Sequence, residues 1–263
     1  MRDEVKYINH KGQTINLNGD GVYANYKESL SYAYELRNGR NLITNKNFEM
    51  LVVTTGGGKT INRMVDILNT DTIKNQYGKL YINGWYIRCQ HTGLPSVIGY
   101  DNALTKVSFS FYAPSFEFTK SRLIMLSEGD AVSTEKQLDF DFDFDFDMSG
   151  MGIIKSTFIN EHALPADFVL RFKAPIGSVE INIGNNIYIV DESINTGETF
   201  VINTEEKRVY KESESGITDL FNKSSDEYDI FAKIPSGEQV ASWVGNFPLS
   251  LLLLEHRSVP LWI

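Results

Sequence analysis

Apolar and polar residues alternate along much of this 263-residue chain, which is the pattern of half-buried β-strands. An extended strand directs alternate side chains to opposite faces and places them about 6.6 Å apart. We therefore expect the most regular alternation to form a ribbon with a phenylalanine face buried between two domains and a solvated aspartate face. It runs from Leu138 to Met148, LDFDFDFDFDM, and contains Asp139, Asp141, Asp143, Asp145 and Asp147, and Phe140, Phe142, Phe144 and Phe146.

The ribbon, residues 139–147, separates two differently patterned parts of the chain. The part before it mixes strands with one helix, whereas the part after it contains only strands and turns. A chain of 263 residues accommodates two domains of ordinary size. We predict a mostly β protein with an N-terminal β domain at residues 1–138 and a C-terminal β-sandwich at residues 139–263, entered through the ribbon.

The N-terminal part contains one helical pattern, near residues 60–75. Thr60 stands where an N-cap is expected. Four apolar residues recur at the spacing i, i+3, i+4 and i+7 and predict a stripe that packs on a sheet: Ile61, Met64, Val65 and Leu68. The flanking segments predict strands, namely Phe48–Thr54, a hairpin at Lys79–Gln90 that turns at Asn83-Gly84, and Lys106–Tyr112.

The C-terminal part predicts a series of short strands separated by turns rich in glycine, proline and asparagine. Their spacing is typical of an all-β sandwich. The predicted strands are Phe168–Ala174, Ser178–Ile183, Asn186–Val190, Glu198–Ile202, Arg208–Lys211, Tyr228–Ile234, Val240–Val244 and Phe247–Leu254.

Charge is distributed unevenly between the two parts. Residues 1–138 carry a net charge of +3 and residues 139–263 carry −12. An acidic C-terminal half is a poor partner for nucleic acid or an anionic membrane, so we expect neither sequence-specific nucleic acid nor a membrane among its partners. The single cysteine, Cys89, excludes an internal disulfide. The first residues lack the apolar core of a signal peptide, and the run Leu249–Leu254 is too short to span a membrane.

The glycine-rich segment Thr54–Thr60, TTGGGKT, invites comparison with the phosphate-binding loop GxxxxGK[ST]. That motif requires a glycine five residues before Gly58, and Val53 occupies the position. The strand–helix–strand alternation that normally surrounds such a loop is also missing. We interpret the segment as a strand-to-helix turn and not as a nucleotide site.

No other group of residues predicts a catalytic, cofactor or metal site. The histidines lack metal-binding spacing, and zinc-protease and hydrolase motifs are missing. Calcium requires about six to eight oxygen ligands around one point, and the aspartates of a straight ribbon cannot converge in this way. We expect a non-enzymatic protein without cofactor or metal. The four histidines are His10, His91, His162 and His256.

The order of these features resembles one known family, the distal tail proteins of long-tailed phages of Gram-positive bacteria. The resemblance rests on the helix run NRMVDILN, the hairpin KLYINGWYIRC, LDFDFDFDFD in the linker position, and NTGETFVINTEEKRVYKE followed by FAKIPSGEQVASW. The ending EHRSVPLWI is similar to the Arg-Ser-x-Pro-x-Trp close of tail-tip proteins. These segments span nearly the whole chain, although the prolines common in the linker are missing.

The resemblance implies a structural protein of the phage tail tip, or baseplate, with a galectin-like C-terminal sandwich. In the family, the N-terminal domains form a hexameric ring that continues the tail tube, and the C-terminal domains splay outward. Tube protein stacks on one side of the ring and the tail-associated spike or fibre protein on the other. Receptor-binding or other peripheral baseplate proteins attach in some phages. The family therefore implies a homohexamer of the virion, made in the host cytoplasm.

Two other functions remain open from the sequence. The C-terminal sandwich could be a carbohydrate-binding adhesin module in which Trp85, Trp243 or Trp262 stacks on sugar, although tryptophans in strands are more often core or interface residues. The His-Asn-Pro-Arg signature of sugar-binding galectins is absent, and Trp243-Val244-Gly245 matches only part of the pattern. A nucleotide-hydrolysing enzyme would need the phosphate loop that the glycine spacing argues against.

Overall fold

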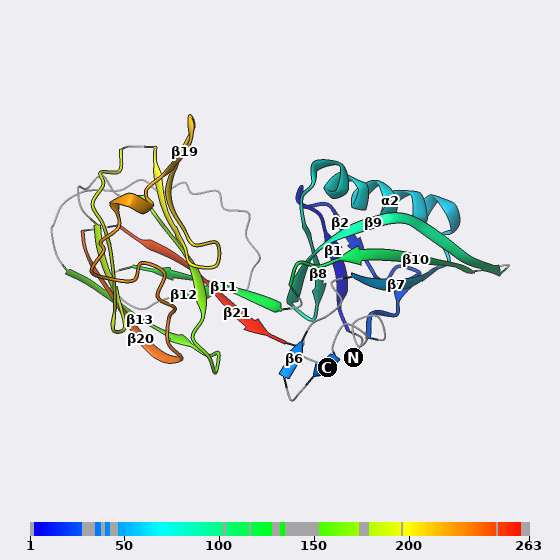
Figure 1. Cartoon of the computed structure of the whole chain (residues 1–263), viewed down its shortest axis with the longest axis horizontal. Coiled ribbons are helices and arrows are strands. Elements are labelled where there is room, and N and C mark those ends of the chain that lie inside the picture. Colours follow the sequence, from blue (N-terminus) through cyan, green and yellow to red (C-terminus); the bar gives the residue numbers. More distant parts are fainter. Residues whose placement is uncertain are drawn as a thin grey trace. The chain divides into compact units, whose positions relative to one another are not determined.

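The chain is mostly β with one long α-helix, α2, as the sequence predicts (Figure 1). The computed structural model describes residues 3–27, 35–37, 40–42, 47–101, 104–115, 117–127, 132–134, 153–173, 179–195, 197–245 and 247–258. Two compact units are present: unit 1 comprises Met1–Lys120 with His256–Ile263, and unit 2 comprises Ser121–Glu255. The predicted domain boundary after residue 138 and the ribbon 139–147 lie outside the described residues.

Unit 1 is built from antiparallel strands around α2 (Gly57–Lys74). Strand pairing follows the orders β2-β1-β8-β9 and β9-β10-β7-β4-β3, so the long strand β9 takes part in both. The strands are β1 (Val5–Ile8), β2 (Thr14–Asn16), β3 (Asn18–Gly19), β4 (Val22–Ala24), β7 (Asn47–Thr54), β8 (Gly78–Ile82), β9 (Trp85–Asp101) and β10 (Leu104–Tyr112), with a separate hairpin of β5 (Glu35–Arg37) and β6 (Arg40–Leu42).

The core of unit 1 forms where α2 packs on these strands (Figure 1). β7 and β10 each bury alternate side chains, and Met50 on β7 lies opposite Phe109 on β10. From the predicted helix stripe, Met64 and Leu68 are buried, and Ile61 and Val65 are half-buried against the same core. Ile67 is a further buried helix residue that the four-residue pattern does not include.

The start of α2 differs from the sequence prediction. The helix begins at Gly57 after Gly56 as N-cap, so Thr60 lies in the first turn and does not cap the helix. The hydroxyl of Thr54, at the end of β7, accepts a hydrogen bond from the backbone N–H of Gly56 at 3.0 Å. A side chain at Gly56 would collide with the Thr60 hydroxyl, so a glycine here lets the chain pass directly from strand to helix.

A buried carboxylate fixes the other end of α2. Asp71, which is fully buried, accepts hydrogen bonds from the Tyr7 hydroxyl at 2.5 Å and from the backbone N–H of His10 at 2.9 Å. The His10 ring nitrogen Nδ1 lies 2.5 Å from the same carboxylate. A Cβ at Gly78 would collide with the Tyr7 hydroxyl and the Asp71 carboxylate, so β8 passes this site only because a glycine stands there.

The hairpin between β8 and β9 confirms the predicted turn. Asn83 and Gly84 both adopt positive φ values, 50° and 82°, which a two-residue turn of this hand requires. The Asn83 side chain accepts a hydrogen bond from the backbone N–H of Glu4 at 2.9 Å and donates one to Asp3 at 3.0 Å. The turn is thereby joined to the residues before β1.

Unit 2 is a sandwich of two antiparallel sheets. One has the order β19-β18-β17-β14-β21-β11, with β12 paired to β11, and the other has the order β13-β20-β15-β16. The strands are β11 (Phe118–Leu126), β12 (Val132–Thr134), β13 (Ile153–Asn160), β14 (Asp167–Phe172), β15 (Val179–Ile183), β16 (Asn186–Val190), β17 (Thr199–Asn203), β18 (Arg208–Ser213), β19 (Gly216–Asp219), β20 (Gly237–Val244) and β21 (Leu249–Arg257), with a short 3₁₀ helix at Phe221–Lys223.

Side chains from both sheets form the core of unit 2. Phe168 on β14 meets Tyr188 on β16 edge to face, with ring centroids 5.3 Å apart. Trp243 on β20 is buried, and its indole N–H donates to the Phe247 carbonyl at 2.8 Å. Apolar side chains of both sheets therefore face one another and form the interior of a β-sandwich.

One predicted strand of unit 2 is wrong. The segment Tyr228–Ile234 contains turns, and only Ile234 makes a β-bridge, to Ala166. The Asp229 side chain accepts a hydrogen bond from the backbone N–H of Phe231 at 2.9 Å, and its carbonyl accepts from Ala232 at 3.0 Å. An aspartate that bonds its own neighbouring backbone favours a turn over an extended strand.

Replacing Asp71 by alanine is expected to lower the free energy of unfolding by roughly 3 kcal/mol, because the buried Tyr7 hydroxyl would lose its acceptor. Asp66→Ala, on the exposed side of the same helix, is the matched control and should change it by less than about 0.5 kcal/mol. Urea denaturation followed by circular dichroism measures both. Equal effects of the two substitutions would contradict the role assigned to Asp71.

Candidate functional site

Unit 1 exposes an apolar strand edge on β9. Among the described strands, β8 pairs with the first part of β9, and the stretch 91–99 has only β10 beside it. The exposed fractions of Leu94 and Ile98 are 89% and 61%, and Val97 is also exposed. Figure 1 shows β9 and β10 extending together past the end of α2. An unpaired apolar edge of this kind favours pairing with another chain.

The pattern of the sequence did not predict this edge, although a signal was present. Val97 and Ile98 are consecutive apolar residues, and both are exposed. The register with β10 shifts between Val97 and Gly99, so Ile98 lies at a β-bulge, where the regular alternation of faces is interrupted. This break in the alternation of apolar and polar residues is the signal for the exposed edge.

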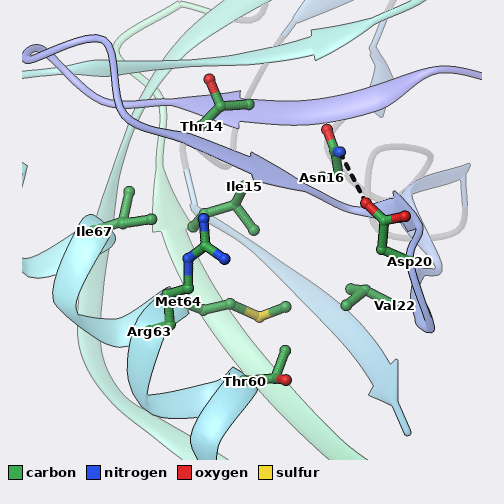
Figure 2. A pocket seen from close by; sticks show the side chains of 9 residues that line it. All are labelled: Thr14, Ile15, Asn16, Asp20, Val22, Thr60, Arg63, Met64 and Ile67. Carbon is green, nitrogen blue, oxygen red and sulfur yellow. Dashed lines mark hydrogen bonds between the residues drawn. The ribbon is translucent and has the colours of Figure 1, made fainter. Parts of the chain in front are cut away.

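A pocket of about 210 Å³ lies between α2 and the strands β2 to β4 (Figure 2). Its floor is apolar and consists of buried side chains, and its rim is polar. The floor residues are Ile15, Val22, Met64 and Ile67, and the rim residues are Thr14, Asn16, Asp20, Thr60 and Arg63. Of these nine residues the sequence analysis singled out only Met64 and Thr60, because the pocket combines segments that are about 40 residues apart in the chain.

The rim carries both signs of charge. The Asp20 carboxylate accepts a hydrogen bond from the Asn16 amide at 3.3 Å. Arg63 extends from α2 toward β2, and among the described residues it has neither an ion-pair nor a hydrogen-bond partner (Figure 2). The pocket therefore presents an available cation above an apolar floor.

The glycine-rich segment Thr54–Thr60 runs from the last residue of β7 through Thr55 and Gly56 into the first turn of α2. Lys59 is exposed in the first turn of the helix. No βαβ crossover surrounds it in the described residues, because β7 pairs antiparallel with both of its neighbours. The segment therefore lacks the architecture of a phosphate loop.

The histidines have separate environments. His10 contacts Asp71, His162 contacts the backbone of Leu164, and His256 lies 3.2 Å from the Thr119 hydroxyl through Nδ1. In the described part of the chain, no three His, Cys, Asp or Glu side chains are grouped so that they could hold a metal ion. The aspartates of the ribbon lie outside that part.

His91 is buried with both ring nitrogens unpartnered among the described residues. Its ring packs edge-on against Phe109 and Phe111, with centroids 5.7 and 5.8 Å away. Burial lowers the pKa of His91 because the charged imidazolium would lose its hydration. The residue therefore acts as an uncharged core side chain.

Other reactive and ring-bearing side chains are also part of the core. Cys89 is buried, and burial raises the pKa of its thiol well above the usual range, so the reactive thiolate is disfavoured. Trp85 and Trp243 are buried, which removes both from a sugar-stacking surface, and Trp262 lies outside the described residues. No helix in the described residues has the length and hydropathy needed to cross a membrane.

No protein-family model matches the sequence, and no curated protein matches it. Solved structures are similar. A chain of the phage P2 baseplate in its activated conformation with Ca has a TM-score of 0.57 at 11% identity, over 99% of this chain and 100% of that chain. A chain of the same baseplate with Sr has a TM-score of 0.60 at 10% identity over the same shares. The Dit (gp 19.1) protein of phage SPP1 has 0.49 at 11% identity, over 98% of this chain and 100% of that chain.

This chain shares its fold with phage baseplate proteins. The likeness to the P2 baseplate chains extends over nearly all of both sequences, so both units and their order along the chain are included. At 10 to 11% identity the similarity concerns the fold. It agrees with the phage tail-tip resemblance that the order of sequence motifs implies.

Lys59→Ala is expected to change the free energy of unfolding by less than about 0.5 kcal/mol, because the side chain is exposed in the first turn of α2. ATP should leave the melting temperature of the unsubstituted protein unchanged. Differential scanning fluorimetry with and without ATP measures both effects. An ATP-dependent rise that disappears in Lys59→Ala would restore the phosphate-loop interpretation.

Acid should destabilise unit 1 through His91. Its folded-state pKa lies below the unfolded value of about 6.5, so its contribution is complete above that pH and is lost as the pH falls below it. The difference in unfolding free energy between His91→Phe and the unsubstituted protein should therefore shift in favour of the variant between pH 7.5 and pH 5.

Urea titrations at the two pH values measure that shift. Phe109→Leu, which alters the same packing without a titrating group, is the control and should have the same effect at both pH values. A pH-independent effect of His91→Phe would show that His91 takes up its proton equally in the folded and unfolded states.

Proposed function

We propose that this protein is a structural hub of a phage tail tip, a hexameric ring that joins the tail tube to the tail-associated spike or fibre protein. The observation that carries the proposal is the fold similarity to phage baseplate chains over 99% of this chain and 100% of theirs. A shared fold alone does not define a function. Here it agrees with an independent line, the order of motifs that resembles distal tail proteins.

An exposed strand edge of unit 1 supports the proposed ring. A ring is built from one contact repeated around an axis, in which an edge of each subunit meets a different surface of its neighbour. The exposed apolar stretch of β9, with Leu94, Val97 and Ile98, offers such an edge. Burial of one such side chain contributes about 1.5 to 3 kcal/mol, so a few of them can hold neighbouring subunits together.

The composition of the two units supports a binding role without catalysis. Cys89, His91 and the Asp71 carboxylate are buried, and His10 and His162 contact the Asp71 carboxylate and the Leu164 backbone. In this proposal unit 1 contacts the tube protein and the spike or fibre protein. Unit 2 is a galectin-like sandwich that faces peripheral or receptor-binding proteins. The assembled protein belongs to the virion.

The purified protein is expected to form a hexamer or to convert to one as its concentration rises. Replacing both Leu94 and Ile98 by glutamate should shift it to smaller species, because the charged side chains cannot be buried at a subunit contact. Ile217→Glu is the matched control, since Ile217 is 58% exposed on β19 of unit 2.

Multi-angle light scattering over a wide concentration range, with electron microscopy of the same samples, measures the outcome. The proposal fails if only monomers are found, with no rings even when tube protein is added. If the ring persists in the Leu94 and Ile98 variant, a different surface of unit 1 forms the subunit contact.

A further inference from the structure

The size of the pocket between α2 and β2–β4 limits what it can bind. Its volume of about 210 Å³ is below the roughly 300 to 1,000 Å³ of most small-molecule sites. One large apolar side chain is the size of group that such a space accepts. The apolar floor matches this, since Ile15, Val22 and Met64 would surround the inserted group.

The rim residues favour a ligand that carries a negative charge beside its apolar group. Arg63 and the hydroxyls of Thr14 and Thr60 have no hydrogen-bond partner among the described residues, and all three can donate. Asp20 is partly engaged by Asn16. A carboxylate near Arg63 would complete the rim, whereas one near Asp20 would be repelled.

We infer that the pocket is a docking site for an acidic, aromatic segment of a second copy of this chain, residues 138–148. That segment alternates aspartate with phenylalanine and carries five negative charges, whereas residues 1–138 carry a net charge of +3. An extended peptide directs alternate side chains to opposite sides, so one phenylalanine enters the floor while aspartates remain at the level of the rim. The inference rests on the proposed ring, which holds neighbouring copies close together.

The first experiment uses a fluorescein-labelled synthetic peptide of residues 138–148, titrated with the full chain and followed by fluorescence anisotropy. Saturable binding is expected, and Arg63→Glu should weaken it by about tenfold or more. Asp20→Asn should strengthen binding, because it removes the repelling charge. Lys59→Glu, which makes the same charge change at an exposed position of the same helix, should have little effect.

Two altered peptides test the chemistry of the segment. A peptide with asparagine in place of each aspartate and one with alanine in place of each phenylalanine should both bind weakly. Binding should also weaken as salt is added, because an exposed ion pair is screened. Equal binding of all three peptides, or equal losses from Arg63→Glu and Lys59→Glu, would overturn the inference.

The second experiment identifies the occupant in the intact protein. A photo-reactive benzophenone side chain replaces Phe142 in the full chain, and ¹⁵N-labelled and unlabelled chains are mixed before irradiation. The expected crosslinks join position 142 to the pocket segment Thr60–Ile67, and about half of them join a labelled to an unlabelled chain. Crosslinks confined to single chains, or to other surfaces, would overturn the assignment to a second copy.

These results separate the inference from the function on which it rests. If the ring forms and the peptide does not bind at Arg63, the docking site is wrong and the proposed function stands. If the peptide binds at Arg63 and the protein stays monomeric, the hub proposal fails and the docking site stands as a peptide site.

Discussion

The buried carboxylate of Asp71 is the interaction on which unit 1 depends. A charge without hydration is costly unless it is fully hydrogen-bonded, and Tyr7 and His10 provide the donors. These contacts join the last turn of α2 to β1 and the turn after it, and Gly78 leaves room for them. Asn9 also donates to the Ile67 carbonyl and Thr72 to the His91 carbonyl, so polar contacts at this end of α2 fix its position along the strands. The core under the helix and the pocket beside it depend on that position.

The edges of the β-sheets differ in how they are covered. In the four-stranded sheet of unit 2, the outer edge of β16 is covered by the segment around Ser224, which forms a bridge with Val190. In unit 1, the stretch 91–99 of β9 has no such cover among the described strands and carries apolar side chains. Edges that are neither paired, covered nor charged are a liability for an isolated protein. Unit 2 also has such an edge, because β13 ends the four-stranded sheet and exposes Ile153 and Ile159. The β9 stretch is chosen for the proposed subunit contact because Leu94 is the most exposed apolar side chain of the described residues.

Local pattern alone determined most of the architecture. Period-2 alternation identified β7 and β10, because each is half-buried and one face must be apolar. Short apolar runs between turn residues identified β14 to β18, β20 and β21 of unit 2, whereas β11, β12, β13 and β19 were not predicted. The apolar stripe identified α2, and Asn83-Gly84 identified the β8–β9 turn, because only a few residue types adopt two consecutive positive φ values. The mostly β class and the single long helix could thus be predicted from the sequence.

Other features were decided only by the tertiary structure. Helical periodicity places Asp71 on the same face as Met64 and Leu68, but its partners are 61 and 64 residues away in the sequence and do not follow from its neighbours in the helix. The pocket rim likewise combines Asp20 with Arg63, and burial of His91 beside Phe109 and Phe111 lowers the pKa of its imidazole. Periodicity reports which face of an element is apolar, and it carries no information on which distant residues that face will meet. Polar sites and exposed edges depend on contacts between residues that are distant in the sequence, so only the folded chain defines them.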